Sequence, residues 1–73
     1  MRDWNVHAKA VLRSEMARRQ VTAADLARLL GELDVQENER NLGNKIARGT
    51  FSAAFFLQCL AAMKVQNLHL GEG

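Results

Sequence analysis

The segment that decides the fold runs from Val21 to Gly49 and reads VTAADLARLLGELDVQENERNLGNKIARG. It carries the start and stop signals of two short helices in succession. Thr22 and, three residues later, Asp25 match the capping box, in which both side chains accept backbone hydrogen bonds at a helix N-terminus. Val21, just before the cap, can pack against Leu26 as a hydrophobic staple. The sequence therefore predicts a helix that begins directly after Thr22.

The apolar residues of this helix recur at the spacing of one helical face. We expect burial of each leucine on that face to contribute ~1.5–3 kcal/mol. Gly31 should weaken or end the helix, although the leucine period continues beyond it. The four leucines are Leu26, Leu29, Leu30 and Leu33.

The second helix of the segment has two possible starts. Asp34, with Glu37 three residues later, resembles a further capping box, and Asn38 is the other candidate N-cap. We expect this helix to occupy about residues 37–48. Gly49 then suits the position just after a helix, where the backbone turns left-handed.

Leu42 and Ile46 mark the inward face of this second helix. At about 100° per residue, they leave a polar side facing outward. Lys45 lies at the flank of that side. The outward residues are Arg40, Asn41, Asn44 and Arg48.

Helices are expected on both sides of this segment. Asp3 is a good N-cap for a helix that runs to about Arg19, and Ser52 caps a helix near the C-terminus. Phe51 and Phe56 are placed as a second hydrophobic staple. The apolar face of the first helix consists of Ala8, Val11, Leu12 and Met16.

Between Ala53 and Met63 the only polar residue is Gln58. A helix that is apolar on all sides has to be covered on all sides, and three short helices cannot easily cover it. We therefore expect a homodimer in which part of this helix is the interface. The expected interface residues are Phe55, Leu57 and Cys59.

The length of 73 residues predicts one domain, and the helical patterns above make it an all-α domain of four helices, with its core at 3–65 and a tail at 66–73. The segment from Val65 to Leu70 is expected to form a brief strand or to lie extended over the first helix and Trp4. A single core of this size seldom supplies more than ~3–5 kcal/mol. Chains of this size usually need a disulfide, a metal or a partner. One cysteine excludes an internal disulfide and no metal cluster is visible in the sequence, so a partner subunit is the remaining source of stability.

The net charge of +2 is spread unevenly along the chain. Residues 32–39 contain only acidic charges, and the basic residues Arg40, Lys45 and Arg48 follow them. The acidic block argues against indiscriminate phosphate binding, whereas the local basic face is compatible with a nucleic acid.

Several function classes find no support in the sequence. No signal peptide and no apolar run of ~20 residues is visible, so we expect a cytoplasmic chain that does not contact a membrane. His7 and His69 have no neighbours suited to complete a metal site. Cys59 lies in an apolar helix and reads as a small buried hydrophobe. No catalytic constellation or glycine-rich phosphate loop is present, so neither an enzyme nor a cofactor is expected.

The segment 22–30 resembles the first helix of the lambda-repressor-like (XRE-type) helix-turn-helix, where a [ST]-x-x-[DE]-L-A-x-x-L pattern is usual. Residues 46–49 resemble the end of the recognition helix in that family, and residues 55–65 resemble the helix that follows it. The resemblance covers roughly residues 21–65. Residues 41–52 also fit N-L-x-N-K-I-x-R-G-x-F-S, the signature of a small bacterial group of uncharacterised helix-turn-helix-like domains.

The chain departs from the XRE-type pattern at three places. The segment 31–38 is longer than the usual turn between the two helices. Gly43 stands where that family has an apolar core residue, because the inward pair is spaced by four rather than three. The short tail replaces a fifth helix.

The resemblance implies a DNA-binding transcription regulator that acts as a homodimer, with its third helix in the major groove of double-stranded DNA. Asn pairs bidentately with adenine, and Arg or Lys with guanine. Arg40 could also hold phosphate, and Thr22 could contact it through its hydroxyl. The expected DNA-binding residues are Thr22, Arg40, Asn41, Asn44, Lys45 and Arg48.

Two other interpretations remain open at this point. The polar face of the third helix could be an ordinary solvated surface. Alternatively, the domain could be a non-enzymatic adaptor that binds another protein through the apolar face of its fourth helix. DNA binding falls steeply with salt because bound phosphates release counterions, whereas an apolar contact responds little.

Overall fold

The computed structural model describes residues 3–70, which form four α-helices and no strand. The helices are α1 (Trp4–Arg18), α2 (Ala23–Gly31), α3 (Glu39–Arg48) and α4 (Ala53–Ala62). The all-helical, four-helix prediction is confirmed. Gly71 to Gly73, the end of the expected tail, lie outside the described residues.

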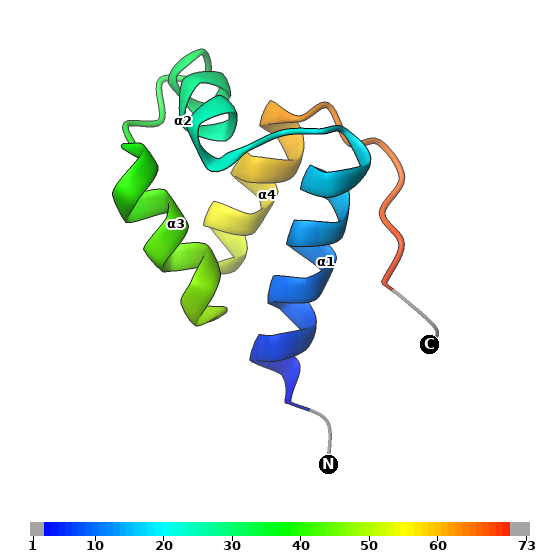
Figure 1. The fold of residues 1–73 in the computed structure, drawn as a ribbon. Coiled ribbons are helices and arrows are strands. Elements are labelled where there is room, and N and C mark those ends of the chain that lie inside the picture. The colour runs from blue at the N-terminus through cyan, green and yellow to red at the C-terminus, as the bar shows by residue number, and fades with distance from the viewer. Residues whose placement is uncertain (1–2, 71–73) are drawn as a thin grey trace.

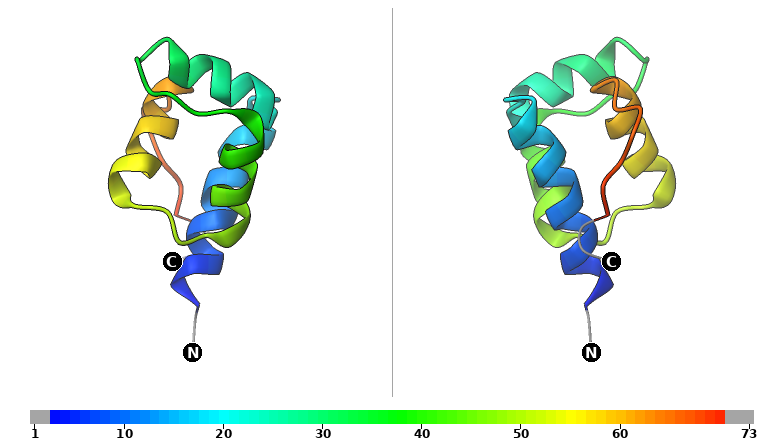
Figure 2. Two further views of the ribbon diagram at one scale, coloured as in Figure 1. Left: turned by 90° about the vertical axis from the view of Figure 1, so that its left-hand side faces the viewer. Right: turned by 90° about the vertical axis from the view of Figure 1, so that its right-hand side faces the viewer.

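The helix α2 lies across one end of the other three helices (Figure 1). The helices α1, α3 and α4 run roughly along one direction, and α2 runs across it in the side views (Figure 2). Both α1 and α2 contact both α3 and α4. The core lies between these pairs, and the outer side of α3 is covered by no other helix (Figures 1 and 2).

Each helix begins at a residue whose side chain accepts backbone N–H groups that have no partner inside the helix. Asp3 caps α1, and Ser52 accepts from the N–H of Phe55 at 3.0 Å at the start of α4. The predicted capping box of α2 is present, since Thr22 and Asp25 exchange hydrogen bonds at 3.0 and 3.1 Å. The Phe51–Phe56 staple also forms, with stacked rings 5.8 Å apart.

The connection between α2 and α3 decides between the two predicted starts of α3. Asn38 is the N-cap, because its Oδ1 accepts from the N–H of Asn41 at 2.8 Å. Asp34 instead takes a left-handed conformation, with φ 61°, in the turn that ends α2. Leu33 lies in this turn and is 46% exposed, so its predicted burial is wrong. The helical period is broken at Gly31, the last residue of α2.

The core consists of apolar side chains from all four helices. Leu26 and Leu30 are fully buried, whereas Leu29 is half-buried at the margin of the core. On α1, Val11 and Leu12 are buried, and Met16 is partly buried against the core. The fully buried apolar residues are Leu12, Leu26, Leu30, Leu42 and Cys59.

Among residues 3–70, one charged residue is buried with this core. Glu15 of α1 is 1% exposed, and its carboxylate pairs with the guanidinium of Arg19 one turn later. Arg18 lies 3.9 Å from the other carboxylate oxygen. A buried carboxylate needs such partners, since leaving it unpaired costs far more than the pair itself contributes.

The C-terminal tail lies extended beside α1 and forms no strand over the part that is described (Figure 1). Leu68 packs partly against the core, and His7 Nε2 lies 2.6 Å from the carbonyl oxygen of Leu70. The Trp4 side chain is 68% exposed, and its ring meets that of His7 edge-on at 5.8 Å.

Gly49 fixes the end of α3 against the start of α1. Its φ of 71° is left-handed, and a Cβ at this position would lie 2.5 Å from the backbone oxygen of Asn5. Lys9 of α1 donates to the carbonyl oxygen of Ala47 at 3.2 Å, which satisfies one of the last carbonyls of α3. The close approach of α1 and α3 therefore requires glycine here.

We expect Gly49→Ala to lower the free energy of unfolding by about 2 kcal/mol or more, because it combines a left-handed alanine with a backbone clash. Gly31→Ala is the control, since a Cβ there meets nothing within 4 Å. Urea denaturation followed by circular dichroism measures both variants. Equal stability of the two variants would contradict the assigned role of Gly49.

Candidate nucleic-acid interface

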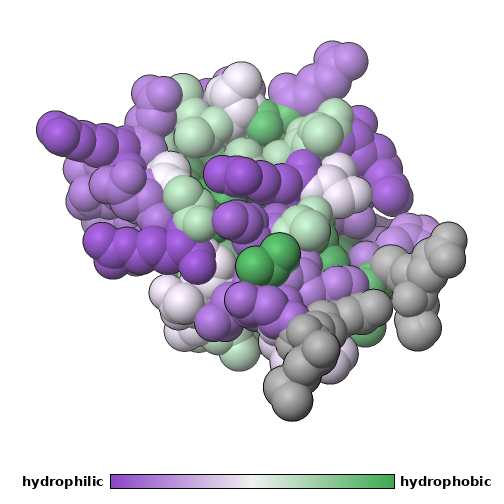
Figure 3. All heavy atoms as spheres, turned by 60° about the horizontal axis from the view of Figure 1, so that its bottom comes forward, coloured by the Kyte–Doolittle hydropathy of each residue, from purple (hydrophilic) through white to green (hydrophobic). Residues whose placement is uncertain are grey.

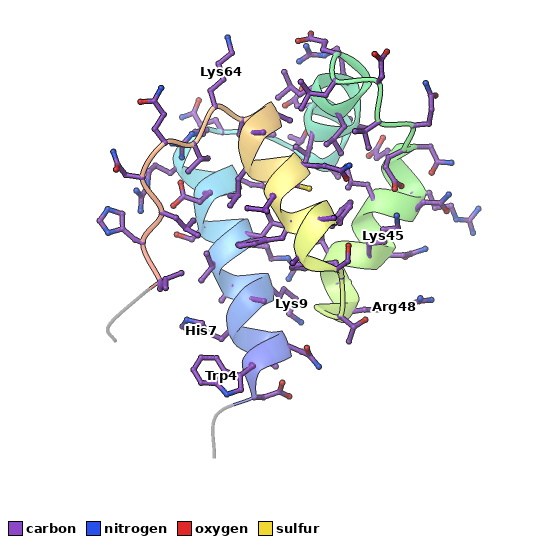
Figure 4. All side chains as sticks on the ribbon, turned by 180° about the vertical axis from the view of Figure 1, so that it is seen from behind. Trp4, His7, Lys9, Lys45, Arg48 and Lys64 are labelled. Carbon is purple, nitrogen blue, oxygen red and sulfur yellow. The ribbon has the colours of Figure 1, made fainter. Side chains whose placement is uncertain are left out.

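The helix α3 is held by two side chains and leaves its opposite side in solvent. Leu42 is fully buried and Ile46 is 3% exposed, which confirms the predicted inward face. The polar residues predicted for the outer face, Arg40, Asn41, Asn44 and Arg48, are all exposed. Figure 4 shows Arg48 extending away from the domain. Hydrophilic side chains also protrude on the side where α3 lies in Figure 3.

The outer face of α3 is a ridge between two shallow hollows. One hollow lies toward the start of α2, and we call it the Gly43 hollow; the residues that line it are Ala23, Asn38, Glu39, Arg40, Asn41, Gly43 and Asn44. The other lies toward the α2–α3 connection and is lined by Gln36, Glu37, Asn41, Asn44, Lys45 and Arg48. Asn41 and Asn44 line both hollows and therefore form the crest of the ridge.

Lys45 stands apart from the other predicted DNA-binding residues. Its ammonium group pairs with the carboxylate of Glu37 and lies 5.0 Å from the centre of the Phe55 ring. Both partners hold it on the flank of α3 that faces the start of α4. The structure therefore exposes Arg40, Asn41, Asn44 and Arg48 on one face of α3. Lys45 lines the second hollow at the edge of this face, where it is paired with Glu37.

Thr22 lies at the end of α2 that borders the Gly43 hollow, next to Ala23. Its hydroxyl oxygen accepts the N–H of Asp25, and its own N–H donates to that carboxylate. This donated N–H is the largest cause of the lowered pKa of Asp25, to which the nearby Arg28 adds. The negative charge of Asp25 thus occupies the end of α2 where the sequence predicted a phosphate contact through Thr22.

Two of the three residues expected at a dimer interface are buried within a single chain, which corrects that prediction. Phe55 is 6% exposed and Cys59 is fully buried in the core. The error lies in treating α4 as apolar on every side. Its outer face carries small alanines, which need little cover, and Leu57, which is 63% exposed.

Glu37 is the site residue that the sequence analysis missed, because it was considered only as part of a helix cap and of the acidic block at 32–39. Its side chain is 11% exposed and reaches Lys45 eight residues later. No helical spacing indicates such a pair, because Glu37 precedes the helix and Lys45 lies within it. The pair depends on the path of the α2–α3 connection.

Burial, and to a smaller extent the nearby carboxylate of Glu37, raise the pKa of the Cys59 thiol to about 12, while Lys45 acts in the opposite direction. A thiol becomes a nucleophile only as the thiolate. This agrees with the reading of Cys59 as a small buried hydrophobe.

We expect Cys59 to resist iodoacetamide at pH 8 in the folded protein and to react readily in denaturant. Because the folded pKa lies above the unfolded one, stability is unaffected below about pH 9 and falls as the pH rises toward 12. Urea denaturation between pH 8 and 10 measures this fall, and Cys59→Ala should remove its contribution. Rapid labelling of the folded protein would contradict the assigned burial.

Comparisons with known proteins give one positive result. No curated protein and no solved structure matches the chain. Over residues 3–70, no helix is long and apolar enough to cross a membrane. Residues 4–68 match the family model described as a domain of unknown function, DUF6471. Since this match covers nearly the whole sequence, the chain belongs to the DUF6471 family.

Proposed function

We propose that this domain binds double-stranded DNA, with the outer face of α3 in the major groove. The observation that carries the proposal is the ridge of Asn41 and Asn44, flanked by Arg40 and Arg48, on the outer side of α3, which no other helix covers. A single α-helix fits the major groove of B-form DNA. A protruding helix with amide and guanidinium groups is the shape and chemistry that such a groove accepts.

The arrangement of α2 and α3 supports this proposal. The helix α2 lies across the end of α3, as the first helix of a helix-turn-helix lies across its recognition helix (Figure 2). The connection of residues 32–38 is longer than the usual turn of three to four residues. Its length agrees with the departure from the XRE-type pattern noted in the sequence.

The side chains on the ridge suit base edges more than phosphates. Asn amides can pair with adenine N6 and N7, and an arginine fork pairs with guanine O6 and N7. Lys45, neutralised by Glu37, adds little attraction for phosphate. Only Arg40 and Arg48 remain as cations on the outer face of α3, so one copy of the domain is expected to bind weakly.

Weak binding by one copy favours a homodimer on DNA. The exposed face of α4 offers Leu57 beside Ala53, Ala54 and Ala61 as a small apolar contact between copies. Leu57→Glu should keep such a dimer apart. Light scattering of the wild type and of this variant, with and without DNA, tests the proposal, and identical masses would refute the placement of Leu57.

We expect binding to a fluorescent duplex pool to weaken by no more than about tenfold per bound copy between 50 and 200 mM salt, which is the loss if Arg40 and Arg48 both neutralise phosphates. Arg48→Ala and Asn44→Ala should each weaken binding about fivefold or more at constant thermal stability. Arg13→Ala, an exposed arginine on α1, is the matched control. No binding by the wild type at 50 mM salt would refute the proposed function.

The ion pair between Glu37 and Lys45 generates a prediction of opposite sign. Glu37→Gln should strengthen DNA binding several-fold, because it frees Lys45 and removes a negative charge beside the ridge. Glu32→Gln changes the net charge equally, but Glu32 faces Arg28 on α2. Titration of labelled DNA with both variants separates the local effect from the effect of net charge.

The adaptor function has less support in the structure. Phe55 and Cys59 are buried, so the apolar face of α4 offers only Leu57 and alanines to a protein partner. Binding that depends on Leu57 but not on salt or on Arg48 would favour that function.

A further inference from the structure

Gly43 lies in the middle of α3, although the fold does not require glycine there. A Cβ at this position would meet nothing within 4 Å. The only left-handed glycine among the described residues is Gly49, so Gly43 gains nothing from its conformational freedom. Glycine in a helix interior destabilises the helix relative to alanine. The free space beside Gly43 therefore has no structural purpose within the described chain.

This space is the Gly43 hollow, which has a volume of about 850 Å³ and is open to solvent. One wall is Ala23, at the start of α2, and the other is the first half of α3. Both Ala23 and Gly43 lack long side chains, so the two backbones can be approached closely. Arg40 and the amides of Asn38 and Asn41 lie at its margin as hydrogen-bond donors.

We propose that the Gly43 hollow receives one sugar–phosphate strand of the DNA whose major groove α3 enters. This inference rests on the proposed function and adds a contact to it. A helix in the major groove has a DNA backbone on either side, and the flank of α3 next to α2 is the side that carries Gly43. A side chain at position 43 would stand between this backbone and the floor of the hollow.

The charges around the hollow define how the strand is held. Arg40 supplies one cation, whereas the carboxylate of Glu39 lies in the same hollow and opposes a phosphate. Close approach at Gly43 therefore has to rely on hydrogen bonds and on shape more than on charge. Contacts of this kind position the protein on the duplex without reading its sequence.

The experiment compares Gly43→Ala and Gly43→Leu with Gly31→Ala and Gly31→Leu. Gly31 is also helical with nothing within 4 Å of a Cβ, but it lies at the far end of α2 and does not line the hollow. Thermal unfolding and binding to the fluorescent duplex pool are measured for all four variants and for the wild type. Both alanine variants should melt at or above the wild-type temperature, because alanine favours the helix.

We expect DNA affinity to fall in the order wild type, Gly43→Ala, Gly43→Leu, with a loss of about tenfold or more for leucine. The Gly31 variants should bind as the wild type does. Affinity unchanged by Gly43→Leu, in a protein whose wild type binds DNA, overturns this inference and leaves the proposed function intact. Absence of wild-type binding overturns both this inference and the proposed function. A melting temperature of Gly43→Ala below that of the wild type would contradict the finding that a Cβ at position 43 meets no neighbouring atom.

Discussion

The anchoring of α3 by Leu42 and Ile46 is the constraint on which the rest of the structure depends. A helix of ten residues that buries only two large side chains cannot be fixed by packing alone. Contacts at the two ends of α3 fix its position where the core packing does not. Asn38 caps the first turn, and Gly49 lets the last turn close against Asn5 of α1. Because both ends are tied, every other side chain of α3 is available to solvent, and a polar ridge can exist on so small a domain.

The pair of Glu37 and Lys45 connects this ridge to the core. Glu37 stands in the connection before α3, and Lys45 reaches from α3 over the Phe55 ring toward α4. Phe55 and Cys59 below them belong to the core. Because the Glu37 side chain is only 11% exposed, solvent screens this ion pair only in part. The pair therefore helps to order the connection of residues 32–38 between α2 and α3. The same pair removes a cation from the outer surface, which makes the net charge of +2 a poor guide to where the chain can attract an anion.

Much of the fold could be predicted from the sequence, because its signals are local. Thr22 with Asp25, and Ser52 with Phe51 and Phe56, each fix a helix start within a few residues of chain. Prediction failed where a helix ended before its apolar period did and where packing was non-local. The leucine period suggested burial of Leu33, but α2 ends at Gly31, the N–H of Leu33 donates to the carbonyl oxygen of Leu30 in a tighter turn, and Leu33 is exposed. The apolar sequence of α4 suggested an uncovered face that includes Phe55 and Cys59. Both residues are buried instead, and the exposed side of α4 carries alanines and Leu57. The outer face of α3 was placed well, whereas the partners of Lys45 depend on a connection whose path no periodicity describes.

For the proposed binding of DNA, the distribution of charge favours a mode in which shape matters more than electrostatic attraction. The α2–α3 connection and the start of α3 are acidic, and Asp25 occupies the N-terminus of α2. Such a surface gains little from counterion release, which supplies most non-specific affinity for DNA. Discrimination then has to come from the amides and arginines on the ridge, because acidic neighbours weaken correct and incorrect sites alike. A domain with low non-specific affinity is bound less often to competing DNA, so a modest affinity per copy is compatible with the proposed binding of DNA by two copies.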